Sequence, residues 1–323
     1  MTATAFQTNS DRLVSRARPR TSILRWLTPF AALSAAAATG GCVIRVGGST
    51  PFEARGSEAL SASAPVTRLV VHNRVGDVIV TADPAASGVT AEAVKIGKGR
   101  TDELADRALS EISVWLQPRA GAADVLEAVS DHPDQKRGRA YAVDWRITAP
   151  PGLAIEVRAD VGDVHVEGFD GPADLRTDVG DIRALQIARG VSVRTDVGDV
   201  TVKAAGPIDV RTDVGSADVA VLPGEPGSIT ITTDVGSAEL RLPADFEGTI
   251  TASADVGSIT STLAGPQTRA RKIPPRDHLQ TTIGSGSGRT ATITTEVGDV
   301  RIRQAATSEQ SSSATSRSQA PSM

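Results

Sequence analysis

The stretch VSVRTDVGDVTV, residues 191–202, contains the pentapeptide RTDVG, which occurs again at 176–180 and 211–215. Looser copies, each containing Val-Gly, place their glycines at 162, 236, 257 and 298. The first five steps between successive glycines are 18, 18, 17, 21 and 21 residues, and the last is 41. Because a catalytic loop is needed only once, a turn repeated at this spacing indicates a repeating architecture or an array of binding sites.

Apolar residues alternate with polar ones on both sides of each turn. In the central copy Val193 precedes the glycine by five positions and Val200 follows it by two, and apolar residues recur there in the other copies. This period of two is typical of strands with one buried face. The glycine is predicted to supply a positive φ at the turn, and the valine directly before it is predicted to point inward.

A unit of at most 21 residues cannot bury its own apolar face, but copies stacked on one another can. We therefore expect an all-β protein, a parallel β-solenoid that is right-handed and β-helix-like, with equivalent residues stacked at about 4.8 Å. An antiparallel meander or sandwich is the competing arrangement, because its strand spacing looks similar in sequence.

Composition divides the chain into five parts. Residues 1–41 have the order of a secretory signal peptide, with five arginines, then a mostly apolar run at 26–38, then small residues. Residues 42–65 are predicted to be a lipid-anchored tether, and 66–150 a β-rich region with one short helix at 101–110 that caps the repeats. The repeats occupy 151–303, and 304–323 form a Ser-rich tail that is predicted to be disordered.

Cys42 is the only cysteine, so it cannot form an internal disulfide. Its place after Gly40 and Gly41 resembles that of the lipid-attachment cysteine of bacterial lipoproteins, although Thr39 stands where that family usually has an aliphatic residue. The resemblance implies export and a lipid anchor in the cell envelope, and Val43 in place of Asp favours the outer membrane. An ordinary cleaved signal with an incidental cysteine is the alternative.

Each turn also carries charge. In RTD the arginine and the aspartate are two residues apart, so they lie on the same face of a strand. Stacking therefore predicts two adjacent columns that are candidates for surface binding, one formed by Arg158, Arg176, Arg194 and Arg211 and the other by Asp160, Asp178, Asp196 and Asp213. Stacked like charges repel, and the neighbouring column of opposite charge offsets that repulsion.

A second acid follows the glycine in three successive copies, as Asp163, Asp181 and Asp199. Carboxylates at such turns accept hydrogen bonds from nearby backbone N–H groups, so a structural role is the main interpretation. Calcium, which takes about 6–8 oxygen ligands, is the alternative, although the signature of calcium-binding nonapeptide repeats does not occur here. No other cofactor is expected.

Composition also argues against several classes of function. The formal net charge of −4 gives no support to a nucleic-acid partner. The four histidines are too scattered for zinc-ligand spacing. Aromatic residues make up only 3% of the chain, so few are available to stack on sugar rings. We assign no catalytic residue.

The order of the motifs resembles a known family. VGDVIV at 75–80 is followed by VDWRITAPPGLAIEVRADVGDVHVEGFDG at 143–171 and then by serial TDVGD turns. This order resembles the bacterial β-strand-repeat family called "putative adhesin", a family of unknown function, and is similar to the head-GIN adhesins. The resemblance covers about residues 66–303 and implies a parallel β-solenoid on the cell envelope, with no catalytic residue to carry over.

We therefore expect an exported, non-enzymatic lipoprotein, an adhesin or scaffold that presents charged columns to envelope glycans or proteins. Its contact with the membrane would be the lipid anchor. Two alternatives stay open at this point. One is a calcium-dependent β-helix enzyme that acts on polysaccharide, and the other is a component of an envelope-stress sensor.

Overall fold

The computed structural model describes residues 45–46, 52–63, 65–134, 138–224, 227–263, 267–272, 276–284 and 289–304. All of them belong to one compact unit, residues 33–323. They form two sheets of twelve strands each and a helix, α1 (Asp102–Ser110). The predictions for the signal peptide, for Cys42 and for the tail after residue 304 lie outside the described residues.

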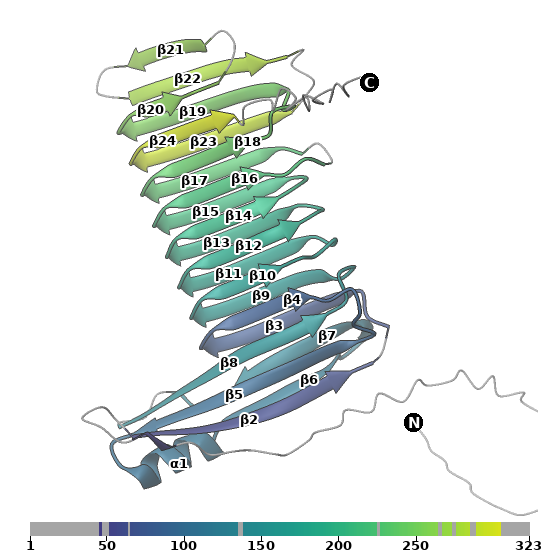
Figure 1. Ribbon diagram of the computed structural model, residues 1–323. Helices are drawn as coiled ribbons and strands as arrows, with labels where there is room; N and C mark the ends of the chain where they lie inside the picture. The colour runs from purple at the N-terminus through teal and green to yellow at the C-terminus, as the bar shows by residue number, and fades with distance from the viewer. Residues whose placement is uncertain are drawn as a thin grey trace, which may run out of the picture. The chain divides into compact units, whose positions relative to one another are not determined.

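The strands of the two sheets follow a clear spatial order (Figure 1). Sheet A contains, in that order, β1 (Arg45–Val46), β2 (Phe52–Ala62), β5 (Val89–Gly99), β8 (Arg139–Ala149), β4 (Val78–Ala82), β10 (Val164–Glu167), β12 (Ile182–Ile187), β14 (Val200–Ala204), β16 (Ala217–Val221), β18 (Ala238–Leu242), β24 (Val300–Gln304) and β20 (Ile259–Ser261). Sheet B contains β21 (Gln267–Lys272), β22 (Arg276–Ile283), β19 (Gly248–Val256), β23 (Thr290–Val297), β17 (Ile229–Val235), β15 (Ile208–Val214), β13 (Val191–Val197), β11 (Ala173–Val179), β9 (Ala154–Val161), β3 (Arg68–Val75), β7 (Ala122–Asp131) and β6 (Ser113–Arg119).

Each repeat gives one strand to each sheet, with the Val-Gly turn between the two strands. Equivalent strands of successive repeats pair in parallel, so that Arg176 lies opposite Arg158 on one side and opposite Arg194 on the other. The all-β, parallel prediction is confirmed, and the antiparallel alternative is wrong for the repeats. The two mostly parallel sheets are not closed into a barrel.

One apolar core lies between the sheets. It is built from the alternating positions that the sequence indicates, such as Val193 of sheet B and Val202 of sheet A, which are 2% and 0% exposed. The core continues into the N-terminal region, where Trp145 is fully buried opposite Val78. Because residues 43–323 contain every described strand and this whole core, this polypeptide holds all the contacts on which the described fold depends.

The predicted short helix is present, and its packing has a local cause. Thr101 caps α1 by accepting a hydrogen bond from the Leu104 backbone N–H at 3.3 Å. The helix lies close against β5 because Gly97 has no side chain there. A Cβ atom on Gly97 would stand 2.3 Å from the backbone nitrogen of Leu109.

The tether predicted over 42–65 is wrong for Phe52–Ala62, which form β2. This strand pairs antiparallel with β5 along eleven residues, from Phe52 opposite Gly99 to Ala62 opposite Val89. The composition of the segment is that of a linker, but the edge of β5 offers unpaired N–H and C=O groups, and the segment satisfies them. Pairing with a distant strand therefore outweighs local composition.

The predicted division at residue 150 does not mark a structural boundary. Strands β3 and β4 carry their own Val-Gly turn, and they lie within the stack, beside β9 and β10. A Cβ atom on Gly162 would stand 2.1 Å from the carbonyl oxygen of Gly76, which shows how closely the two turns stack. The first repeat of the stack is thus residues 68–82, ahead of the segment in which the sequence becomes visibly periodic.

Candidate functional site

The turn glycines explain why the same turn recurs. Gly198 has a φ of +153°, and the other turn glycines have φ values from +118° to +154°. A Cβ atom on Gly198 would stand 2.0 Å from the carbonyl oxygen of Gly180 in the preceding repeat. Glycine is therefore required twice, by its backbone conformation and by the close approach of the neighbouring turn.

The threonine of RTD fills the interior of each corner. Thr177, Thr195 and Thr212 are at most 1% exposed. The Thr195 hydroxyl donates to the carbonyl oxygen of Gly180 at 3.2 Å, and the Thr212 hydroxyl donates to that of Gly198 at 3.2 Å. A buried hydroxyl is tolerated because it satisfies a carbonyl group that the turn leaves open.

The valine that follows RTD does not point inward, contrary to the prediction. Val197 is 47% exposed, and Val179 and Val214 are 46% and 48% exposed. The alternation ends at the threonine, because the chain turns at the glycine and the corner is already filled by the threonine side chain. The valines therefore lie on the surface of the turn.

The second acids link each repeat to the next. The backbone N–H of Asp181 donates to Asp163 Oδ1 at 2.9 Å, and the N–H of Asp199 donates to Asp181 Oδ1 at 2.9 Å. Ser216 continues the series with an N–H bond of 2.8 Å to Asp199 Oδ1. These bonds are the structural role predicted for the turn acids. Within the described residues, no group of three or more His, Cys, Asp or Glu side chains could hold a metal ion.

At the C-terminal end of the stack, the same kind of hydrogen bond between turns lowers the pKa of Asp299. Asp299 Oδ1 accepts hydrogen bonds from the Ser258 hydroxyl at 2.9 Å and from the Ser258 backbone N–H at 3.0 Å. Both bonds favour the ionised carboxylate, so they hold the pKa of Asp299 below its usual value.

The predicted arginine column lies on the outer face of sheet B. Arg158, Arg176, Arg194 and Arg211 stand opposite one another along β9, β11, β13 and β15. Arg158 is held by Glu156, with 2.9 Å between Nη2 and Oε1. Among the ion pairs of the described residues, none involves Arg176. The Arg176 guanidinium is therefore available to a ligand.

The predicted aspartate column lies between the arginines and the turns, with Asp160, Asp178, Asp196 and Asp213 as its members. Two of these carboxylates face an arginine of their own strand. Arg194 Nη2 is 3.6 Å from Asp196 Oδ1, and Arg211 Nε is 3.4 Å from Asp213 Oδ1. Exposed pairs of this kind contribute about 0–1 kcal/mol each, so both partners can exchange them for a ligand.

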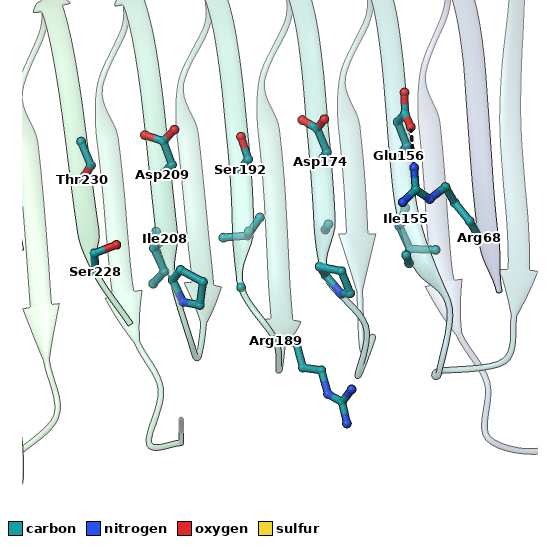
Figure 2. A pocket seen from close by; sticks show the side chains of 16 residues that line it. Arg68, Ile155, Glu156, Asp174, Arg189, Ser192, Ile208, Asp209, Ser228 and Thr230 are labelled. Carbon is teal, nitrogen blue, oxygen red and sulfur yellow. Dashed lines mark ion pairs between the residues drawn. The ribbon is translucent and has the colours of Figure 1, made fainter. Parts of the chain in front are cut away.

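A groove with a volume of about 650 Å³ crosses the same outer face beside the arginine column. One row of polar side chains runs along it, a single residue from each successive strand, as Figure 2 shows: Glu156, Asp174, Ser192, Asp209 and Thr230. Arg68 is paired with Glu156 at 3.7 Å, and Arg189 projects from the loop before β13. The ion pairs within the described part of the chain leave Asp174 and Asp209 unengaged.

Sequence reasoning located the charged columns but missed the groove. Asp174, Ser192 and Asp209 each stand two residues before an arginine of the column, so alternation places them on the same outer face. Extending the column comparison by two positions would have identified this row. The groove itself could not have been found in this way, because Pro172 and Pro207 line it from loops outside the alternating strand pattern.

The chain is similar in structure to three solved bacterial proteins. They are a "putative cell adhesion protein" from Clostridium sporogenes (15% identity, TM-score 0.35, 78% of this chain and 100% of that chain covered), a "putative adhesin" from Bacteroides fragilis (16%, 0.38, 76% and 96%) and a "putative adhesin" from Parabacteroides merdae (11%, 0.27, 78% and 96%). No family model matches the chain, and no curated protein matches it. In the described part of the chain, no helix has the length and apolar character needed to cross a membrane.

Proposed function

We propose that the protein is a non-catalytic, adhesin-like protein of the cell envelope, and that the outer face of sheet B binds a linear acidic glycan. The observation that supports this most directly is the available Arg176 guanidinium, which stands in an in-register arginine column beside the polar row of the groove. The column and the row repeat with the strands, so they suit a ligand that also repeats.

The chemistry of the two features is complementary to an acidic sugar chain. A guanidinium binds a carboxylate through two parallel hydrogen bonds, which favours the arginine column for the acidic groups. Sugar hydroxyls can donate to the carboxylates of Asp174 and Asp209 and can exchange hydrogen bonds with the Ser192 hydroxyl. Each contact is weak, but contacts repeated along one polymer act together.

We also propose the finer architecture and location that the sequence indicates. The parallel, in-register pairing of successive repeats supports a β-solenoid, and its right-handed form is our expectation. A lipid on Cys42 would hold the protein on the envelope. Incorporation of labelled palmitate into the full chain tests this anchor, since Cys42→Ser should abolish the label while leaving the fold unchanged.

The glycan hypothesis is tested by titrating the 43–323 polypeptide with polygalacturonate, which carries one carboxylate per sugar. The double variant Arg176→Gln with Arg194→Gln should bind at least tenfold more weakly, because two guanidinium groups that would bind carboxylates of the polymer are lost. Lys203→Gln is the matched control, since Lys203 is an exposed cation of β14 in the other sheet. Binding should also weaken as salt is added.

Two outcomes would overturn the proposal. One is equal binding of the fully methyl-esterified polymer, which has no acidic groups. The other is equal weakening by Lys203→Gln, which would mean that any surface cation suffices. The length of the polymer after incubation, with and without calcium, separates a binding protein from a polysaccharide-cleaving enzyme, because only the enzyme shortens it.

A further inference from the structure

The exposed large apolar side chains of the protein are concentrated in one place. Among the described residues eight such side chains are exposed, and seven of them are the valines that directly precede a turn glycine, with 45–56% of each exposed. These seven residues, here called the valine column, are Val161, Val179, Val197, Val214, Val235, Val297 and Val256 in stack order. The eighth, Ile79, lies in β4 of sheet A.

The valine column is continuous. Val179 lies opposite Val161 and Val197, and Val297 lies opposite Val235 and Val256. Strands in a sheet are about 4.8 Å apart, so seven positions span about 29 Å. A contiguous apolar strip of this length, bordered by polar residues, is the kind of surface that marks an interaction site.

The turn itself leaves the valines uncovered. The residue two positions earlier, which is threonine in five repeats and alanine in two (Ala159 and Ala254), occupies the interior, so the valine side chain is directed away from the core. The next residue is always glycine, which carries no side chain to cover the valine. No other segment among the described residues shields the column, because each of its members remains about half exposed.

Acidic residues border the valine column along the whole of one side and along part of the other. Each valine is preceded by an acid, and the set is Asp160, Asp178, Asp196, Asp213, Asp234, Glu296 and Asp255. Beyond the glycines stand Asp163, Asp181, Asp199 and Asp299. The carboxylates beyond the glycines accept backbone N–H bonds from the neighbouring repeat. The strip therefore combines an apolar surface with acidic flanks.

We infer that the valine column docks a cationic amphipathic helix of another polypeptide, through apolar contact along the valines and ion pairs with the bordering acids. A helix of about 20 residues spans about 30 Å, which matches the column. Its pitch of about 5.4 Å lies close to the strand spacing, so roughly one apolar residue per turn can meet each valine. Lysine or arginine on the flanks of that helix would face the acids.

Charge selects this occupant over a second copy of the chain. Two copies that met through the same column would bring acid against acid along the whole contact, which is unfavourable. A cationic helix instead meets acids along the whole column. Exposed ion pairs already engage several of these acids, among them Asp181, Asp196 and Asp213, and the helix can replace those pairs at little cost. The valines lie on the turn edge of the stack and do not line the groove of sheet B. The bordering acids Asp160, Asp178, Asp196 and Asp213 also form the aspartate column beside the arginines, so only the apolar part of this proposal is independent of the glycan proposal.

The test uses a labelled 20-residue peptide with leucine at helical spacing and lysine on both flanks, followed by fluorescence anisotropy and circular dichroism. The 43–323 polypeptide should bind it and raise its helix signal. The triple variant Val179→Thr, Val197→Thr, Val214→Thr should bind at least tenfold more weakly, because threonine keeps the β-branched shape and removes the apolar surface. Ile79→Thr is the matched control and should leave the affinity unchanged.

Further variants separate the two parts of the interaction. Asp178→Asn, Asp196→Asn and Asp213→Asn together should lower the affinity and flatten its salt dependence while the melting temperature stays near that of the parent protein. Equal binding of a scrambled peptide, or equal loss with Ile79→Thr, would overturn the proposal. A concentration-dependent dimer that disappears in the valine variant would overturn it in favour of a second copy.

Discussion

The interior of the stack and its two ends are built differently. From β9 to β18 each strand pairs with the equivalent strand of the preceding repeat, so chain order and stack order agree. The N-terminal end departs from this order. There β3 lies between β9 and β7, and β4 lies between β10 and β8, although β7 and β8 come later in the chain than β3 and β4. The C-terminal end departs from it in the same way. There β23 lies between β17 and β19, and β24 lies between β18 and β20, although β19 and β20 come earlier in the chain than β23 and β24.

The difference shows which force acts where. Inside the stack, equal units meet equal units, and register follows from stacking like residues on like. At the ends a sheet edge would otherwise present unpaired N–H and C=O groups. Antiparallel strands cover part of these edges, namely β22 on β19 at one end and β6 on β7 at the other. The first repeat (β3 and β4) and the last repeat (β23 and β24) therefore lie inside the stack, and strands from other parts of the sequence cover them.

The largest expected effect is the loss of stability when a glycine of a stacked turn, and not a glycine of the end hairpin, is replaced by alanine. Gly198→Ala should destabilise the 43–323 polypeptide by more than about 3 kcal/mol, because the new Cβ would stand 2.0 Å from a backbone oxygen that cannot move aside. Gly121→Ala, in the β6–β7 hairpin, has a φ of +82° with nothing within 4 Å and should cost about 1–2 kcal/mol. Urea unfolding measures both, and equal costs would contradict the stacking of the turns.

The next effect tests the order of the last repeats. Ile293 of β23 and Ile231 of β17 are both 0% exposed, so replacing either by alanine should cost about 2–5 kcal/mol. If β23 were the frayed end of the stack, as its place in the chain suggests, Ile293→Ala would cost far less. Denaturant midpoints and slow amide exchange in β23 together decide between the two arrangements.

A smaller effect concerns the corner threonines. Thr195→Val keeps the shape of the side chain but removes the hydroxyl that donates to Gly180, so it should cost about 1 kcal/mol. Thr201→Val, on the less buried face of β14, should change stability by less than about 0.5 kcal/mol. A stabilising Thr195→Val substitution would show that the corner tolerates an unsatisfied carbonyl group.

The smallest effect is a pH dependence at the C-terminal end. The folded pKa of Asp299 is lowered, so its contribution to stability is present above the unfolded value, near 3.9, and is lost as the pH falls through the folded value. Ser258→Ala should raise the pKa of Asp299 toward its usual value, because one of the two bonds is removed. Carboxyl chemical shifts followed against pH measure this, and Ser216→Ala should leave the pKa of Asp299 unchanged.

Much of the stack was predictable from the sequence. The strand period, the positive φ of the turn glycines and the stacking of Arg176 on Arg158 and Arg194 were all expected, and the structure contains them. The short helix expected at 101–110 is present as well. The binding roles of the charged columns and the lipid on Cys42 stay predictions.

Other features escaped prediction for identifiable reasons. The valines were expected inside because the alternation was extended one step too far across the turn. The segment before residue 66 looked like a linker because its composition was judged without the edge of β5 beside it.

The sequence by itself determined the strand, the turn and the columns of like residues, because each depends on contacts within one repeat or between identical repeats. Only the tertiary structure decided the facing of the valines, the pairing of β2 and the position of β23 between β17 and β19. These depend on which distant backbone edges and which corner volumes remain to be filled. That competition between segments far apart in the chain leaves no periodic mark in the sequence.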